Sequence, residues 1–276
     1  MIFVYKKWDA FCKKLSESGY VSVPARDINQ KKNNYIVLKH DVETDVAKAL
    51  VMATIENKYG HRGSYYVQAY LLNDDRNIEM LREIQNMGHE VSYHYDVMDS
   101  CHGDMDAAIA EFENNKRKFE DNGFELKTLC QHGNPIVERV GYTSNRDFFR
   151  SERVRALYPD LSDIMVNFKE LHKTDYVYYS DAGRQFKMIY DPLFNDIINS
   201  DDKNVIYTNL SAVLSSLSAD GRYIISTHPH RWTRSAFTYT VKAFVFKVIK
   251  AIAKLLVKIP VMKKLMSRYY YLAKKI

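Results

Sequence analysis

The sequence alternates short apolar segments of β type with longer segments that repeat apolar residues at helical spacing. The β-type segments are Tyr35–Asp41, Ser64–Tyr70, His89–Tyr95, Phe124–Cys130, Tyr176–Ser180 and Arg222–Thr227. The segments with helical spacing are 6–19, Asp45–Tyr59, Arg76–Met87, Asp106–Asp121 and Ser211–Leu217, whereas residues 136–175 give no clear pattern. Such alternation is typical of α/β folds, in which helices connect the strands of a mainly parallel sheet, either open or closed as a barrel.

Length and cysteine content favour one large domain in a reducing compartment. A chain of 276 residues has room for an α/β barrel, which forms a single domain of about 200–250 residues. The three cysteines include no CxxC pair, which argues against a disulfide scaffold. Lys6 and Lys7 interrupt the apolar start of the chain, and no apolar run reaches the ~18 residues of a transmembrane helix. We therefore expect a cytoplasmic protein.

Charge is distributed very unevenly along the chain. Of the 40 Lys and Arg residues, 13 lie after Asp220, and no Asp or Glu lies there. Residues 1–220 contain the other 27 basic residues and all 34 acidic residues, which gives this part a net charge of −7. An acidic body with a basic tail indicates an anionic partner for the tail. We place the domain at residues 1–236 and the tail at 237–276.

The tail contains a segment, residues 239–259, that is amphipathic at helical period. One half of its helical wheel holds Lys242, Lys247, Lys250, Lys254 and Lys258, and the other half holds Phe244, Val248, Ile252, Leu255, Leu256 and Ile259. Pro260 ends this segment, and a second basic segment follows. Helices of this kind lie in the interface of anionic membranes, so we expect peripheral membrane association. The alternative is a helix packed on the domain with its lysines in water. No nucleic-acid-binding motif accompanies the charge, and we expect no nucleic acid partner.

Polar, titratable side chains follow five of the predicted strands at the point where each ends. These clusters are His40–Glu43, His94–Asp96, Gln131–Pro135, Ser180–Arg184 and Thr227–His230. In an α/β barrel the catalytic groups gather at the carboxyl ends of the strands. A single His or Asp at a strand end is usually a turn or cap residue. Five such clusters at equivalent positions indicate a functional site.

Strand alternation separates the polar residues of each cluster into two faces. Asp41 and Glu43 lie on one face of their strand, and His40 lies on the other. The same rule makes His94 an inward candidate and places His89 on the opposite face. Carboxylate and imidazole ligands with one open position form the usual hydrolytic zinc site. Of the two carboxylates on one face, Asp41 and Glu43, one can bind a divalent metal while the other acts as a base. His94 offers an imidazole ligand and His132 can supply a third, with zinc as first choice.

The order of these motifs resembles that of the polysaccharide deacetylases, carbohydrate esterases with a nodulation-deacetylase-type domain. The motifs are HDVE, SYYVQ, GHEVSYHYD, HGNP, SDAGR and STHPHRW, and the resemblance covers Tyr35 to Trp232. More narrowly, the chain resembles divergent members found in surface-polysaccharide gene clusters. The resemblance implies an irregular (β/α) barrel of about seven strands.

The resemblance also implies roles for individual residues. Asp41 matches the aspartate that acts as catalytic base, and Glu43 matches the metal-binding aspartate that follows it. His94 matches the first of two metal-binding histidines, but Met98 stands where the family has the second. Either His132 or Asp96 completes the metal site, or the metal affinity is weak, or the site is inactive.

The family's late histidine protonates the leaving amine, and an aspartate tunes it. His228 matches that histidine, and Asp181 matches the aspartate. The resemblance thus implies a metal-dependent N-deacetylase acting on an N-acetylated sugar, in a surface polysaccharide or in its lipid-linked precursor. One alternative is a catalytically silent homologue that binds a glycan or acts as a scaffold, which Met98 favours. The other is a hydrolase of a different C–N bond, because a fold does not fix the substrate.

Overall fold

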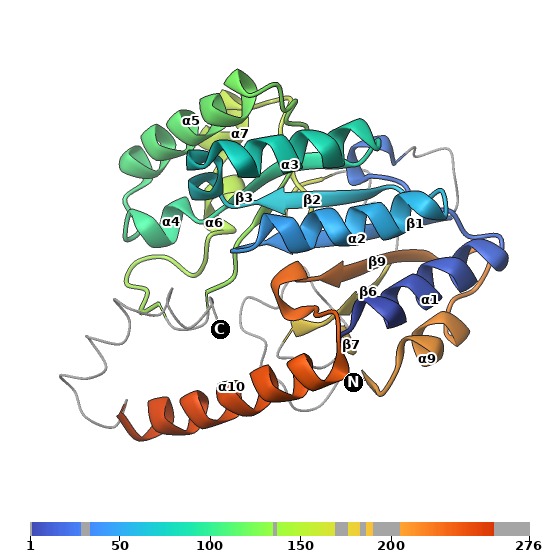
Figure 1. The fold of residues 1–276 in the computed structure, drawn as a ribbon. Coiled ribbons are helices and arrows are strands. Elements are labelled where there is room, and N and C mark those ends of the chain that lie inside the picture. Colours follow the sequence, from blue (N-terminus) through green and yellow to red (C-terminus); the bar gives the residue numbers. More distant parts are fainter. Residues whose placement is uncertain are drawn as a thin grey trace.

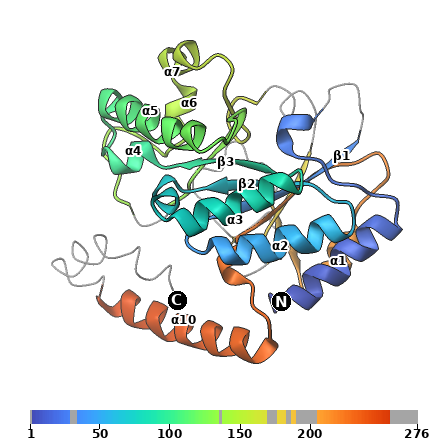
Figure 2. The same cartoon turned by 45° about the horizontal axis from the view of Figure 1, so that its top comes forward.

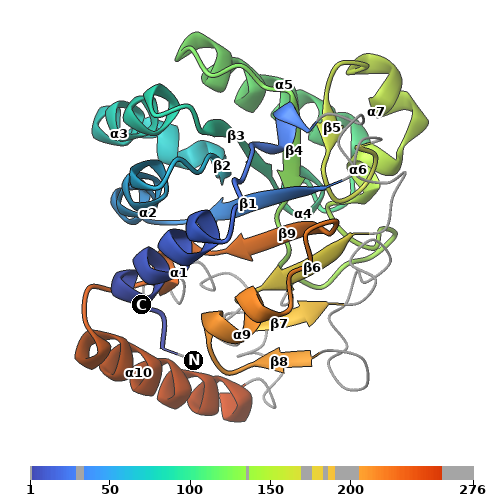
Figure 3. The ribbon, with the colours of Figure 1, turned by 90° about the vertical axis from the view of Figure 1, so that its right-hand side faces the viewer.

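A computed structural model describes residues 2–28, 34–134, 137–168, 176–182, 186–189 and 205–256. Gly183 and Arg184 of the SDAGR motif and the basic segment after Pro260 lie outside these residues. Within them, the chain forms one nine-stranded sheet in the order β5-β4-β3-β2-β1-β9-β6-β7-β8. The seven strands from β5 to β6 are parallel and curl into a half-barrel, and β7 and β8 continue the sheet antiparallel (Figures 1 and 3).

The strands are β1 Tyr35–Val42, β2 Gly63–Val67, β3 Glu90–Tyr95, β4 Thr128–Gln131, β5 Ser162–Asp163, β6 Val177–Ser180, β7 Phe186–Ile189, β8 Val205–Tyr207 and β9 Arg222–Thr227. The α-helices are α1 Tyr5–Glu17, α2 Val46–Lys58, α3 Asp75–Asn86, α4 Val97–Ser100, α5 Met105–Asp121, α6 Asp147–Arg150, α7 Glu152–Leu157, α9 Leu210–Ser215 and α10 Ala236–Leu256. Helices α1, α2 and α3 lie side by side on the outer face of the sheet (Figure 2).

The predicted α/β class and all six predicted strands are confirmed, with small shifts at their ends. The expected strand Ser64–Tyr70 ends already at Val67, because a 3-10 turn, Ala69–Asn73, follows it. Residues 136–175, which gave no clear pattern, contain α6, α7 and the two-residue strand β5. The half-barrel is compatible with the barrel implied by the family resemblance. In the described part of the chain, no strand pairing joins β5 to β8.

The two faces of the sheet carry different side chains, as strand alternation requires. On the outer face of β1, Ile36 and Leu38 pack in one apolar cluster with Trp8 of α1. On the inner face, Lys39 and Asp41 are buried with polar groups of the neighbouring strands. These inner groups are Ser64, Glu90, Ser92, Thr128 and Ser226, all fully or almost fully buried. A half-barrel with a polar interior is suited to hold a site rather than only a core.

His40 and His89 belong to a buried network on the outer face, away from the predicted site. Glu56 of α2 accepts hydrogen bonds from Trp8 Nε1 at 2.9 Å and Tyr65 Oη at 2.8 Å, and its Oε1 lies 3.0 Å from His40 Nε2. Burial acts to raise the pKa of Glu56, but His40 and the hydrogen bonds outweigh it and lower that pKa. The network fastens α1 and α2 to the sheet, so both histidines have structural roles.

The basic tail begins with a long helix, α10, in agreement with the amphipathic pattern. Tyr239 is buried and its ring lies 5.7 Å from that of Phe3, centroid to centroid, in an edge-on arrangement. This contact holds the first turns of α10 against the domain. Among the described residues, no helix combines the length and the apolar composition needed to cross a membrane.

Candidate metal centre and proton-transfer groups

The parallel pairing of β1, β3, β4, β6 and β9 brings the five predicted clusters to one edge of the sheet. Asp41 is the second-last residue of β1 and Glu43 directly follows that strand, while His94 lies near the end of β3. His132, Asp181 and His228 come directly after β4, β6 and β9. All six side chains are buried or nearly so. Sequence reasoning therefore predicted correctly which elements meet there.

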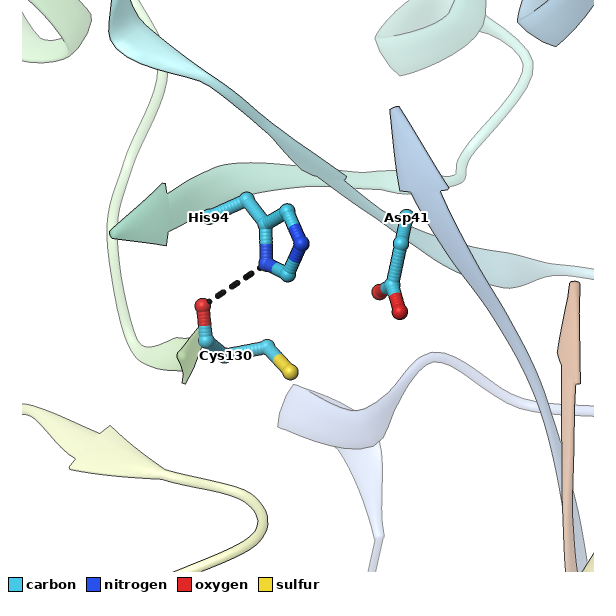
Figure 4. A group of neighbouring side chains, drawn as sticks. All are labelled: Asp41, His94 and Cys130. Atoms are coloured by element: carbon cyan, nitrogen blue, oxygen red, sulfur yellow. Dashed lines mark hydrogen bonds between the residues drawn. The ribbon is translucent and has the colours of Figure 1, made fainter. Parts of the chain in front are cut away.

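Glu43, His94 and His132 form a compact group that is suited to bind a metal ion. Their ligand atoms all lie within 4.8 Å of one another, and each residue is buried. His94 Nδ1 donates to the carbonyl oxygen of Cys130 at 2.9 Å, which leaves Nε2 on the side of Asp41 and available as a ligand (Figure 4). Burial lowers the pKa of His94 to about 3, so its imidazole is neutral at pH 7, as metal binding requires. Two imidazoles and one carboxylate are also the ligands of catalytic zinc sites.

His132 is held in position by its own backbone. Its N–H donates to the carbonyl of Tyr95 at 2.7 Å, and its carbonyl accepts from Asn145 Nδ2 at 2.8 Å. This anchoring places His132 Nε2 at 3.3 Å from Glu43 Oε1. Met98, at the position of the family's second histidine, is buried in the apolar core beside β3. His132, directly after β4, thus supplies an imidazole to the candidate site, whereas Met98 in α4 supplies none.

A second group shares His94 and adds Asp41 and Cys130. The ligand atoms of these three residues also lie within 4.8 Å of one another. Figure 4 shows Asp41 facing the His94 ring, with the Cys130 thiol beside the space between them. Cys130 is buried, and its sulfur lies among the candidate site residues.

Lys39 is a site residue that the sequence analysis missed. Its Nζ lies 2.5 and 2.6 Å from the two carboxylate oxygens of Asp41, and both side chains are buried. Burial acts to raise the pKa of Asp41, but Lys39, His94 and His228 outweigh it and lower that pKa well below its ordinary range. The Lys39 ammonium thus compensates the charge of Asp41. Of the two groups, Glu43, His94 and His132 are therefore the better candidate for binding a metal ion, with Asp41 close by.

Replacing Lys39 by methionine is expected to destabilise the metal-free protein by about 3 kcal/mol, because a buried carboxylate loses its partner. The exposed pair Lys58–Asp9, with its Nζ to Oδ1 distance of 2.9 Å, offers a matched control. Lys58→Met should cost less than about 1 kcal/mol. Urea unfolding after chelation measures both values, and equal effects would contradict the assigned role of Lys39.

At acid pH the free energies of unfolding of the wild type and of Lys39→Met should become more similar. The lowered pKa of Asp41 stabilises the folded wild type at pH values above about 3.9, the pKa of an aspartate in the unfolded chain. That stabilisation is lost as the pH falls below this value. Below about pH 4 the wild type therefore loses the benefit that the variant never had. Unfolding curves at neutral pH and near pH 3 test this sign.

His228 and Asp181 form a buried hydrogen-bonded pair beside the candidate metal centre. His228 Nδ1 lies 2.5 Å from Asp181 Oδ1, and its Nε2 faces the site at 3.7 Å from Asp41 Oδ2 and 3.8 Å from Glu43 Oε1. Asp181 also accepts from the His228 N–H, Arg231 Nη1 and Trp232 Nε1. Burial acts to raise the pKa of Asp181, but His228 and Arg231 outweigh it and keep it ionised.

Five aromatic residues of the sequence motifs lie in the core. Tyr65, Tyr66, Tyr93, Tyr95 and Trp232 are all fully or almost fully buried. A cavity of about 220 Å³ instead lies beside the site, lined by Gln68, Tyr70, Asn73, Asp96, Glu111 and Asn115, among others. Asp96 joins it to the centre, because its Oδ2 lies 3.9 Å from His132 Nδ1. The ring of Tyr70 is half exposed there, and its hydroxyl donates to the carbonyl of Glu43.

Compared with protein-family models, curated proteins and solved structures, the chain matches none.

Proposed function

We propose that this protein is a metal-dependent hydrolase that removes N-acetyl groups from a sugar of a surface polysaccharide or of its lipid-linked precursor. The observation that carries the proposal is the convergence of three functions on one edge of the sheet. A buried Glu43–His94–His132 group lies next to Asp41, and His228, backed by Asp181, lies 3.7 Å from Asp41 and 3.8 Å from Glu43. Amide hydrolysis requires an electrophile, a base and an acid in this proximity.

Each residue has a defined task in this proposal. Glu43, His94 and His132 would hold a divalent ion, zinc first, whose chemistry is to polarise the acetamide carbonyl and to make a water acidic. Asp41 is ionised and accepts a proton from the attacking water. His228 gives a proton from Nε2 to the departing amine. The carboxylate of Asp181 favours the charged imidazolium that this step needs.

The surroundings of the centre support a sugar as substrate. Side-chain amides and carboxylates line the adjoining cavity, and these groups bind hydroxyls. The half-exposed ring of Tyr70 adds an apolar surface next to them. Together with the resemblance to polysaccharide deacetylases, this lining favours an N-acetylated sugar over a peptide or a small aliphatic amide.

A silent glycan-binding or scaffold protein is the second candidate, and one observation favours it. Lys39 contacts both oxygens of Asp41, which weakens this carboxylate as a base. Together with Met98 in place of a ligand histidine, that pairing suits a site that retains its shape without turnover.

Release of acetate from N-acetylglucosamine oligomers, measured after loading the protein with zinc, tests the proposal. We expect turnover that stops when a chelator is added, and that is lost in Asp41→Asn while its zinc content is unchanged. A non-acetylated amide should be a poor substrate, and its rapid hydrolysis would instead indicate an enzyme for another C–N bond. Stoichiometric zinc without acetate release from any acetylated sugar would favour the silent protein.

A further inference from the structure

Helix α10 exposes an unusual number of large apolar side chains. Five of them form what we call the apolar stripe: Phe237, Val241, Phe244, Val245 and Val248. Phe237 is 79% exposed and Phe244 is 67% exposed. Elsewhere in the described chain, exposed large apolar residues occur singly, as at Val140 and Leu157, or as the pair Val205 and Ile206. A contiguous exposed apolar surface of this kind marks an interaction site.

The apolar stripe faces away from the domain. At about 100° per residue its five members fall within an arc of roughly 100°. Tyr239 and Ala243, which contact the apolar cluster around Phe3 and Trp8, lie on the opposite side of the helix. In Figure 1, α10 lies outside the sheet and the helices that cover it. The helix thus contacts the domain through few residues, such as Tyr239 and Ala243, and exposes its apolar stripe. An ordinary surface helix has the opposite orientation, with its apolar side packed on the domain.

The charge around the stripe is of one sign. Lys242 and Lys247 flank the stripe, one on each side, at roughly 110° around the helix axis from the centre of the stripe. Lys247 is exposed. No acidic residue occurs after Asp220, over a stretch with 13 Lys and Arg. A protein partner of mixed charge would leave these lysines uncompensated, whereas an anionic lipid surface pairs with all of them. Apolar residues flanked by lysines also match the depth profile of a bilayer interface.

We infer that α10 lies in the interface of a membrane that contains anionic lipids, with the apolar stripe among the acyl chains and its lysines at the headgroups. The inference does not depend on the reaction at the metal centre. An anionic membrane interface matches both the exposed apolar stripe of α10 and the positive charge beside it.

Sedimentation of the full-length protein with lipid vesicles tests this inference. We expect binding to vesicles of phosphatidylcholine and phosphatidylglycerol in equal parts, and much weaker binding to phosphatidylcholine alone. Added salt should weaken the binding, because it screens the lysines. Replacing Phe237 and Phe244 together by serine should lower the affinity about 100-fold. Replacing Lys242 and Lys247 by glutamine should lower it about 10-fold or more.

A matched control replaces exposed apolar residues outside α10. The Val140→Ser/Leu157→Ser double variant also removes two exposed apolar side chains, but outside α10, and should bind vesicles as the wild type does. All variants should keep the wild-type unfolding midpoint, since each changed side chain is solvent-exposed or at the helix surface. Equal vesicle binding by the stripe variant and the wild type would overturn the inference. So would a stable dimer in light scattering that the stripe variant loses, or tighter binding to nucleic acid than to anionic vesicles.

Discussion

His94→Ala is expected to purify without the divalent ion of the wild type and to lose about 10³-fold or more in deacetylase activity. His94 is the only residue common to both candidate ligand groups of the described chain, so its removal disables either arrangement. The hydrogen bond from Nδ1 to the Cys130 carbonyl fixes the His94 ring, so that Nε2 faces the carboxylates. The alanine variant has no nitrogen at this position. Elemental analysis of the purified protein, beside an acetate assay, measures both losses.

The control for His94→Ala is a histidine outside the site. His102 is exposed and has a φ of 53°, a value that asparagine tolerates well, so His102→Asn changes an imidazole without straining the turn. This variant should retain metal and activity. Metal retained in full by a folded His94→Ala protein would refute a site at this position.

Two further variants determine which group holds the ion. If the ligands are Glu43, His94 and His132, then His132→Ala loses the metal and Cys130→Ser keeps it. The opposite result would assign the ion to Asp41, His94 and Cys130 and would leave Lys39 without its partner. The 2.5 Å contact between Lys39 and Asp41 leads us to expect the first result.

The location of the site could be predicted from the sequence because two simple periodicities determine it. Parallel strands bring all their carboxyl ends to one edge, so polar residues that end separate strands must meet. A period of two residues then separates Asp41 and Glu43 from His40, and the structure places His40 against Glu56 on the outer face. These inferences need only the strand boundaries, which the apolar segments define well.

Other parts of the site depend on packing between distant segments, which periodicity does not encode. Cys130 faces Asp41 because β3 pairs with β4, with His94 opposite Cys130 in the register. Lys39 carried a usable signal, since a lysine within an apolar strand, two residues before Asp41, must lie on the same inward face. The short strands β5 and β8, of two and three residues, are too brief to show any pattern.

The last prediction concerns the acid, His228. Replacing it by glutamine should reduce the rate of deacetylation by about 10²- to 10⁴-fold, the range typical of a lost general acid. The metal content should not change, because His228 belongs to neither candidate ligand group. His230→Gln is the matched control, since its ring lies next to that of His228, at 5.8 Å between centroids, but has no proposed role. Its rate should stay within about tenfold of the wild type.

Asp181→Asn separates positioning from proton transfer. The amide retains the shape of the carboxylate and still accepts from Arg231, Trp232 or the His228 N–H, but it no longer carries a charge that stabilises the imidazolium. We therefore expect Asp181→Asn to lower the rate of deacetylation at unchanged metal content, and to lower it less than His228→Gln does. Wild-type rates in both variants would mean that another group protonates the amine, and that the 2.5 Å contact between Asp181 and His228 only anchors the chain after β9.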